Sequence, residues 1–390
     1  MSLDFLKPKE KFLILEISPK GTDGIFLDID EDRNLIFKKF QKNIDIKKYL
    51  KLSTIGLSQK SFEGKYILKP VRKIIAGVDS SLATTISVPV EKDREDFLKN
   101  NEITFVEFEN LFSQTMASVI SKCKSEASLR LGVENIDTIL VSAKVGHFKI
   151  DSEPVESPIS LIGNKISFVI DLTFTTRKVF EEFKGLFSAP EEFFFIESPN
   201  ASLRALKRVR KLPLALIVLG EEDSWLYILA KGNSKNDVLY REKFNWAFSS
   251  LFDAIQKDFS VGSVASKELY EAYIKNKMSK MASRVFKKTI DPVFELFLKE
   301  IKNKKIQNFV YLDSKYDLPY ELPFKVGKVS VSNIPISEIL SDVDFSLNIK
   351  ADDHKGFIFG HLSPFIEAFF DKDVSNLNKK IRKRLHWLVE

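Results

Sequence analysis

Few residues of this chain have the types and the spacing that catalysis or metal binding requires. The four histidines are scattered, without the short spacing of metal ligands, at His147, His354, His361 and His386. Cys123 is the one cysteine, which excludes an intramolecular disulfide and a cysteine zinc site. No Ser-His-Asp set and no pair of acids stands out, so we expect no catalytic residue and no metal site.

Two turns have residues that bear on ligand binding. The sequence EISPKGTDG (residues 16–24) joins two apolar segments and is therefore expected to form a hairpin turn, in which Pro19 removes a backbone N–H. In a second expected turn, three carboxylates in a row precede Ser224. They would repel an anionic ligand, so we expect this acidic turn to be solvated.

The composition is that of a globular protein with room for two or three domains. Of its 390 residues, 44% are hydrophobic and 29% are charged, which is enough to bury a large core. No apolar run approaches the roughly 18 residues that a membrane-spanning helix needs. The first residues lack the cleavage region of a signal peptide, so a cytoplasmic location is expected.

The net charge of +6 does not indicate a nucleic-acid partner, because much of it is concentrated in one short segment. Residues 373–390 combine these cations with apolar residues on one helical stripe, which predicts an amphipathic helix on an anionic membrane surface. A helix packed on the body of the protein is the alternative. The candidate membrane-binding residues are Val374, Leu377, Lys379, Lys380, Ile381, Arg382, Lys383, Arg384, Leu385 and Leu388.

Residues 73–176 have the pattern of a small α+β module. Thr104 and Glu107 form a predicted capping box at the start of a run with helical periodicity. Apolar residues alternate with other residues over 165–174, which predicts a strand. The expected order is strand, helix, strand, strand.

The order of motifs in this module resembles a domain found in FtsA, the family of bacterial actin-like cell-division proteins. The matching segments are EITFVE (residues 102–107), IDSEPVESPI (residues 150–159) and Gly163 with the strand that follows it. In FtsA this domain is inserted into the first lobe, and the pilus-assembly family PilM shares it. The resemblance implies an α/β, actin-like (ribonuclease H-like) fold of two lobes, with an inserted α+β domain in the first lobe.

The resemblance also implies limits for the domains. The first lobe would comprise residues 1–80 and 177–197, closed by residues 351–372, with the inserted domain at 81–176. The second lobe would comprise residues 198–350, and the basic amphipathic helix residues 373–390.

The nucleotide motifs of the family are degenerate in this sequence. In the first phosphate hairpin, D-x-G-T/S, Glu16 and Ser18 replace the Asp and the Gly. In the second, D-x-G-G-G-T-T-D, Val218 replaces the Asp, and two carboxylates replace glycines whose amides could approach a pyrophosphate. The third motif, a Gly-Gly turn, is replaced by DSKYD (residues 313–317). The resemblance therefore implies a fold that does not hydrolyse ATP. We expect no cofactor, with ATP and Mg²⁺ as the alternative. If a nucleotide does bind, the phosphate contacts that the resemblance implies are Ser18, Lys20, Thr22 and Ser224.

Helices are predicted at residues 244–273 and 278–303, with aromatic stripes that are expected to be core. FtsA-like proteins use this part of the second lobe to grip the tail of FtsZ. Cations here could attract an acidic peptide, although a solvated face is the alternative. They are Lys275, Lys277, Lys280, Arg284, Lys287 and Lys288.

The resemblance thus implies a cytoplasmic scaffold for cell division, peripheral at the inner face of the cell membrane. It would tether FtsZ-type filaments through protein contacts and bind lipid through the terminal helix. Membrane division proteins and self-association are further expected contacts. A PilM-like adaptor that binds a partner's cytoplasmic peptide is one alternative, and an active actin-like ATPase is the other.

Overall fold

The computed structural model describes residues 10–45, 73–96, 98–187, 193–232, 237–348 and 355–369. The chain forms two compact units. Unit 1 contains residues 1–209, 231–238 and 336–390, and unit 2 contains residues 210–230 and 239–335.

The main sheet of unit 1 has the order β16-β3-β2-β1-β4-β9. Its strands are β1 (Glu10–Ser18), β2 (Gly21–Ile29), β3 (Asn34–Gln41), β4 (Lys73–Val78), β9 (Phe193–Glu197) and β16 (Ser346–Asn348). The first three form an antiparallel meander, whereas β4 runs parallel to β1 and β9 runs parallel to β4. Since β1 is buried on both faces, its sequence is an almost continuous apolar run.

The sheet of unit 2 has the order β12-β11-β10-β13-β15-β14, in which the first five strands correspond to β3-β2-β1-β4-β9 of unit 1. Its strands are β10 (Leu214–Leu219), β11 (Ser224–Lys231), β12 (Asp237–Phe244), β13 (Phe309–Ser314), β14 (Phe324–Val326) and β15 (Val329–Asn333). Again a meander opens the sheet, β13 runs parallel to β10, and β15 runs parallel to β13. A meander followed by parallel strands, present twice in one chain, is the topology of the actin-like fold. The fold class expected from the sequence is confirmed.

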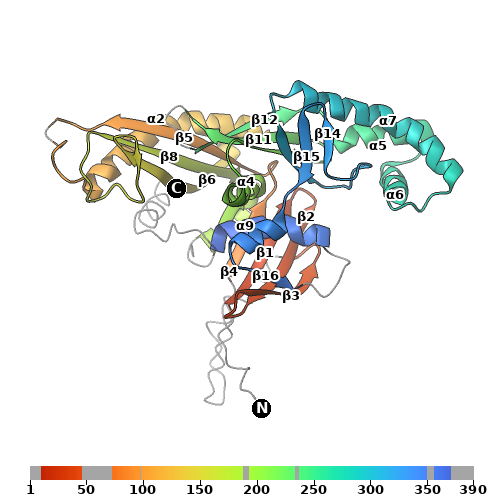
Figure 1. The fold of residues 1–390 in the computed structure, drawn as a ribbon, viewed down its shortest axis with the longest axis horizontal. Helices are drawn as coiled ribbons and strands as arrows, with labels where there is room; N and C mark the ends of the chain where they lie inside the picture. Colours follow the sequence, from red (N-terminus) through yellow and green to blue (C-terminus); the bar gives the residue numbers. More distant parts are fainter. Residues whose placement is uncertain are drawn as a thin grey trace, which may run out of the picture. The chain divides into compact units, whose positions relative to one another are not determined.

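The module between β4 and β9 is a second sheet in unit 1, with the order β5-β8-β6-β7 (Figure 1). Its elements are β5 (Ala83–Asp93), α2 (Phe105–Leu131), the 3₁₀ turn η2 (Asn135–Asp137), β6 (Thr138–Ile150), β7 (Glu153–Pro154) and β8 (Lys165–Thr176). Helix α2 packs on one face of this sheet, where Phe108 contacts Phe148 and Phe168. The predicted strand, helix, strand, strand order is present, and β7 adds a short edge to it.

Helices cover both faces of the main sheet of unit 1. On one face, α3 (Arg177–Phe187) contributes Val179 and Phe183 to a core with strands β1 and β4. On the other face, Phe365 of α9 (Lys355–Phe369) lies 5.2 Å from Phe12 of β1, measured between ring centroids. The remaining helices of this unit are α4 (Ser198–Val209) and α8 (Ile336–Asp342).

The helices of unit 2 differ from the prediction in one place. Residues 244–273 were predicted to form one helix. In the structure Phe244 is the last residue of β12, and the residues after it form two helices, α5 (Phe248–Phe259) and α6 (Ser263–Ile274). The break occurs because Ser260 adopts a left-handed conformation (φ 51°) and caps α5, and Gly262 then precedes α6. The next helix, α7 (Lys280–Asn303), is close to its predicted limits.

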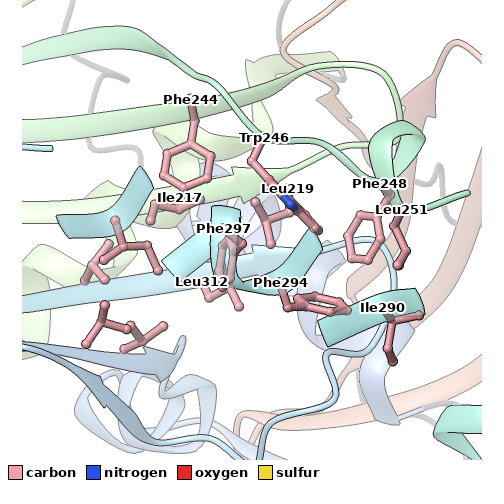
Figure 2. Close-up of a cluster of buried hydrophobic side chains, with 14 of the residues drawn as sticks. Ile217, Leu219, Phe244, Trp246, Phe248, Leu251, Ile290, Phe294, Phe297 and Leu312 are labelled. Carbon is pink, nitrogen blue, oxygen red and sulfur yellow. The ribbon is translucent and has the colours of Figure 1, made fainter. Parts of the chain in front are cut away.

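The core of unit 2 is built around Trp246, as Figure 2 shows. Its ring centroid lies 5.1 Å from that of Phe248, 5.5 Å from Phe294 and 5.0 Å from Phe297. The indole N–H is also satisfied, because it donates to the carbonyl of Val293 at 3.0 Å. The aromatic stripes of these segments are therefore core, as predicted.

We expect Phe297→Ala to destabilise the protein by about 3–5 kcal/mol, because it leaves a cavity among fully buried rings. The free energy of unfolding in urea measures this loss. Met281→Ala on the same helix is the control, since Met281 is 79% exposed and its loss is expected to change stability by less than about 0.5 kcal/mol. Equal effects of the two substitutions would contradict this assignment of the core.

Candidate functional site

The turn between β10 and β11 occupies the position of the second phosphate hairpin. Its backbone is held from both sides: the amide of Gly220 donates to Ser224 Oγ at 3.2 Å, and the amide of Ser249 donates to the carbonyl of Glu221 at 2.7 Å. A Cβ atom at Gly220 would lie 2.1 Å from the carbonyl oxygen of Asp223, so this position requires glycine. The side chain of Ser224, a predicted phosphate contact, is fully buried in this turn.

The carboxylate of Glu221 is bound on both oxygens by groups of unit 2. Lys267 of α6 lies 2.6 Å from Oε1, and the hydroxyl of Tyr316, just after β13, donates to Oε2 at 2.7 Å. Only 11% of the Glu221 side chain is exposed. We call these three residues the Glu221 cluster. The expectation of a fully solvated acidic turn was wrong at this residue.

Aromatic packing positions the hydroxyl of Tyr316 to donate its hydrogen bond to Glu221. The ring lies 4.9 Å from Phe248 and 5.1 Å from Phe252, measured between centroids. Burial, followed by the hydrogen bond to Glu221 and its negative charge, raises the pKa of Tyr316 well above its ordinary value. The phenol therefore keeps its proton at all physiological pH values and remains a donor to the carboxylate.

The segment after β13, for which the resemblance implies a Gly-Gly turn, is fixed by two hydrogen bonds. Ser314 Oγ donates to the carbonyl of Tyr316 at 2.6 Å, and the amide of Lys315 donates to the carbonyl of Leu219 at 3.2 Å. The turn after β10 and the segment after β13 therefore meet in unit 2, joined through the Glu221 cluster. Sequence reasoning did not find this cluster, because its members lie far apart in the chain.

The hairpin turn between β1 and β2 in unit 1 carries the other three predicted phosphate contacts. Ser18 Oγ donates to the carbonyl of Gly21 at 3.1 Å, which closes the turn. Thr22 is buried, and its carbonyl accepts from the amide of Ile44 at 2.6 Å. Lys20 is exposed in the same turn. These three residues thus share one turn, and their predicted role in phosphate binding stays a prediction.

One contact at this edge of unit 1 was not predicted. Ser198, the first residue of α4, donates its hydroxyl to the carboxylate of Glu16 at 3.1 Å. Gly77 of β4 makes room for this contact, since a Cβ there would lie 2.8 Å from Ser198 Oγ and 3.0 Å from Glu16. Glu16 is the residue that replaces the aspartate of the first phosphate motif. Its carboxylate is bound by the hydroxyl of Ser198.

The six predicted partner-binding cations are exposed around the turn from α6 to α7. Lys275 pairs with Glu271 at 2.9 Å and Lys287 with Asp291 at 2.8 Å, both on the surface, where such pairs contribute little. Within the described residues, the other four have no ion-pair partner; they are Lys277, Lys280, Arg284 and Lys288.

Two apolar side chains lie among these cations on α7. Met281 is 79% exposed and Val285 is 50% exposed, although both are large and apolar. We call Lys280, Met281, Arg284, Val285 and Lys288 the basic-apolar face of α7. It begins at the amino end of the helix, where the macrodipole also favours a negative partner.

The predicted membrane-binding residues, from Val374 to Leu388, lie outside the described residues. Among the helices that the structure describes, none is both long and apolar enough to cross a membrane.

Comparisons with known proteins return structures but no sequence family. No protein-family model matches the chain, and no curated protein does. A PilM–PilN type IV pilus biogenesis complex matches 93% of this chain and 98% of that chain, at 11% identity and a TM-score of 0.46. The activator of 2-hydroxyisocaproyl-CoA dehydratase from Clostridium difficile, with bound ADPNP, matches 96% and 97%, at 9% identity and 0.33. MreB 5 of Spiroplasma citri, bound to AMPPNP, matches 50% and 66%, at 11% identity and 0.28.

At these identities the likeness concerns the fold alone. The actin-like fold expected from the sequence is present in the topology of both units. The finer resemblance to FtsA stays a hypothesis.

We expect Tyr316→Phe to destabilise the protein by about 1–3 kcal/mol, because it leaves an oxygen of the buried Glu221 carboxylate without its donor. Urea unfolding measures the change. Tyr240→Phe is a matched control on an exposed tyrosine and is expected to be neutral. A neutral Tyr316→Phe would mean that the Glu221 cluster does not stabilise the turn.

Proposed function

We propose that this protein is an actin-like adaptor, which works by binding a partner and does not hydrolyse ATP. The observation that carries this proposal is the Glu221 cluster. A phosphate at this turn would meet a buried carboxylate, whereas nucleotide-binding loops offer backbone amides. Lys267, which contacts this carboxylate, is already neutralised by it.

The second half of the proposal is the partner. The basic-apolar face of α7 combines three cations with two exposed apolar side chains, so a complementary ligand is an acidic peptide with apolar residues. Apolar contacts with Met281 and Val285 would supply affinity, and the cations would attract the peptide and select for its charge. The same cations disfavour pairing of this face with its own copy.

We propose PilM as the functional analogue, in place of a cell-division scaffold. PilM forms a type IV pilus biogenesis complex with PilN, and by analogy the partner here would be the cytoplasmic segment of a membrane protein. An adaptor of this kind needs only a peptide-binding face, and the basic-apolar face of α7 is a candidate among the described residues. The tethering of FtsZ-type filaments would also need the amphipathic helix that the sequence predicts at residues 373–390, and these residues lie outside the described part of the chain.

We expect the triple variant Lys280→Glu, Arg284→Glu, Lys288→Glu to weaken peptide binding by at least about tenfold in Kd, or about 1.4 kcal/mol. Fluorescence anisotropy measures this with labelled peptides from the same genome. One copies the cytoplasmic segment of a PilN-type protein and the other the acidic tail of an FtsZ-type protein. Binding should also weaken as salt increases.

The matched control is Lys305→Glu, Lys325→Glu, Lys328→Glu, which makes the same change of charge at exposed positions elsewhere in unit 2. It is expected to keep most of the affinity. Binding of only the FtsZ-type peptide would restore the division scaffold. Equal losses in both triple variants would show that the charge of the unit matters and the α7 face does not.

A further inference from the structure

A network of charged side chains in unit 1, centred on a buried carboxylate, is separate from both sites described above. Its centre is Asp237, the first residue of β12, whose side chain is only 3% exposed. Lys231, the last residue of β11, contacts one oxygen of this carboxylate at 2.5 Å, and Lys207 of α4 pairs with the other. All three residues belong to unit 1, which includes the last residue of β11 and the first two residues of β12, although the rest of these strands lies in unit 2.

His147 of β6 completes this group. Its Nδ1 atom lies 4.0 Å from Oδ2 of Asp237, and 28% of its side chain is exposed. The backbone of His147 is left-handed (φ 56°) and lies where the register of β6 with β8 shifts, between Gly146 and Lys149. A β-bulge of this kind redirects a side chain from its place in the strand, here toward Asp237.

The charges that act on His147 come from three neighbouring elements. They are Arg204 and Lys207 on α4, Asp171 on β8 and Asp237 on β12. Asp171 is itself paired with Arg204 and accepts a hydrogen bond from Ser87 at 2.6 Å. With Lys231, three cations surround two carboxylates, so the group is already positive when His147 is neutral.

We propose that His147, Lys207 and Asp237 form an acid-sensitive clasp, which holds the start of β12 on α4 and β6 and loosens when His147 takes up a proton. A protonated imidazole would add a fourth positive charge to a group that has two negative ones. Asp237 would attract the protonated imidazole, whereas Arg204 and Lys207 on α4 would repel it.

The direction of the pKa shifts agrees with this geometry. Burial, followed by the charges of Arg204 and Lys207, lowers the pKa of His147 below its ordinary value of 6.5. A histidine with a lowered pKa in the closed state stabilises that state fully above pH 6.5, and this stabilisation is lost as pH falls below that value. Burial alone would raise the pKa of Asp237, but the bonds from Lys207 and Lys231 outweigh it and lower that pKa. Asp237 therefore stays charged over this range.

Hydrogen–deuterium exchange of the full chain at pH 7.5 and 5.5, corrected for intrinsic rates, tests the clasp. In the natural protein, amides at Asp237, Val238 and in β6 should lose protection on acidification, by up to about tenfold per pH unit for one proton. His147→Asn is the matched variant, because asparagine tolerates the left-handed backbone but does not titrate. It should show no such loss.

Asp237→Asn should lower protection at the same amides already at pH 7.5, since it removes the charge that Lys207 and Lys231 bind. If this variant does not fold, Lys231→Met replaces it, with the same expected direction. An equal loss on acidification in the natural protein and in His147→Asn would overturn the proposal, and so would unchanged protection in the natural protein. These readouts do not depend on the peptide face of α7.

Discussion

The direction of two strand pairs determines where the turns after β1 and β10 lie. In unit 1, β4 runs parallel to β1, and in unit 2, β13 runs parallel to β10. The carboxyl ends of parallel strands lie at one edge of the sheet, and this edge is where open α/β sheets bind ligands. The hairpin turn after β1 therefore lies beside the end of β4, and the turn after β10 lies beside the end of β13.

The same constraint explains why unrelated stretches of sequence meet in this protein. In unit 1 it brings Glu16 to Ser198, at the start of the helix that follows β9. In unit 2 it brings Glu221 to Tyr316. Both Glu16 and Glu221 are carboxylates held by side chains of their own unit. Of the two, Glu221 is the one that stands where the resemblance implies a glycine. The strand order of the actin-like fold is present in both units. We infer that this fold presents a partner-binding surface.

Local patterns in the sequence predicted local structure well. They failed where the contacts of a side chain come from residues far away in the sequence. The capping box illustrates both cases: the amide of Glu107 donates to Thr104 Oγ at 3.1 Å, as predicted, but the Glu107 carboxylate binds Arg94 instead of reaching back to the cap. Arg94 reaches the helix through the tertiary fold, which helical periodicity cannot show. Glu221 was expected to be solvated for the same reason, because its partners lie 46 and 95 residues further along the chain. In the sequence, the break between α5 and α6 is marked only by Ser260 and Gly262. The apolar pattern that continues past them predicted one long helix.

The most direct test of this account is whether ATP binds to the folded protein. Urea unfolding of the full chain would be measured with and without millimolar Mg-ATP, since any ligand that binds the folded state alone must stabilise it. We predict the same free energy of unfolding in both conditions, because Glu221 and its partners close the phosphate turn. A gain of about 2.7 kcal/mol, which corresponds to ATP at a hundredfold its Kd, would contradict the account and restore the actin-like ATPase.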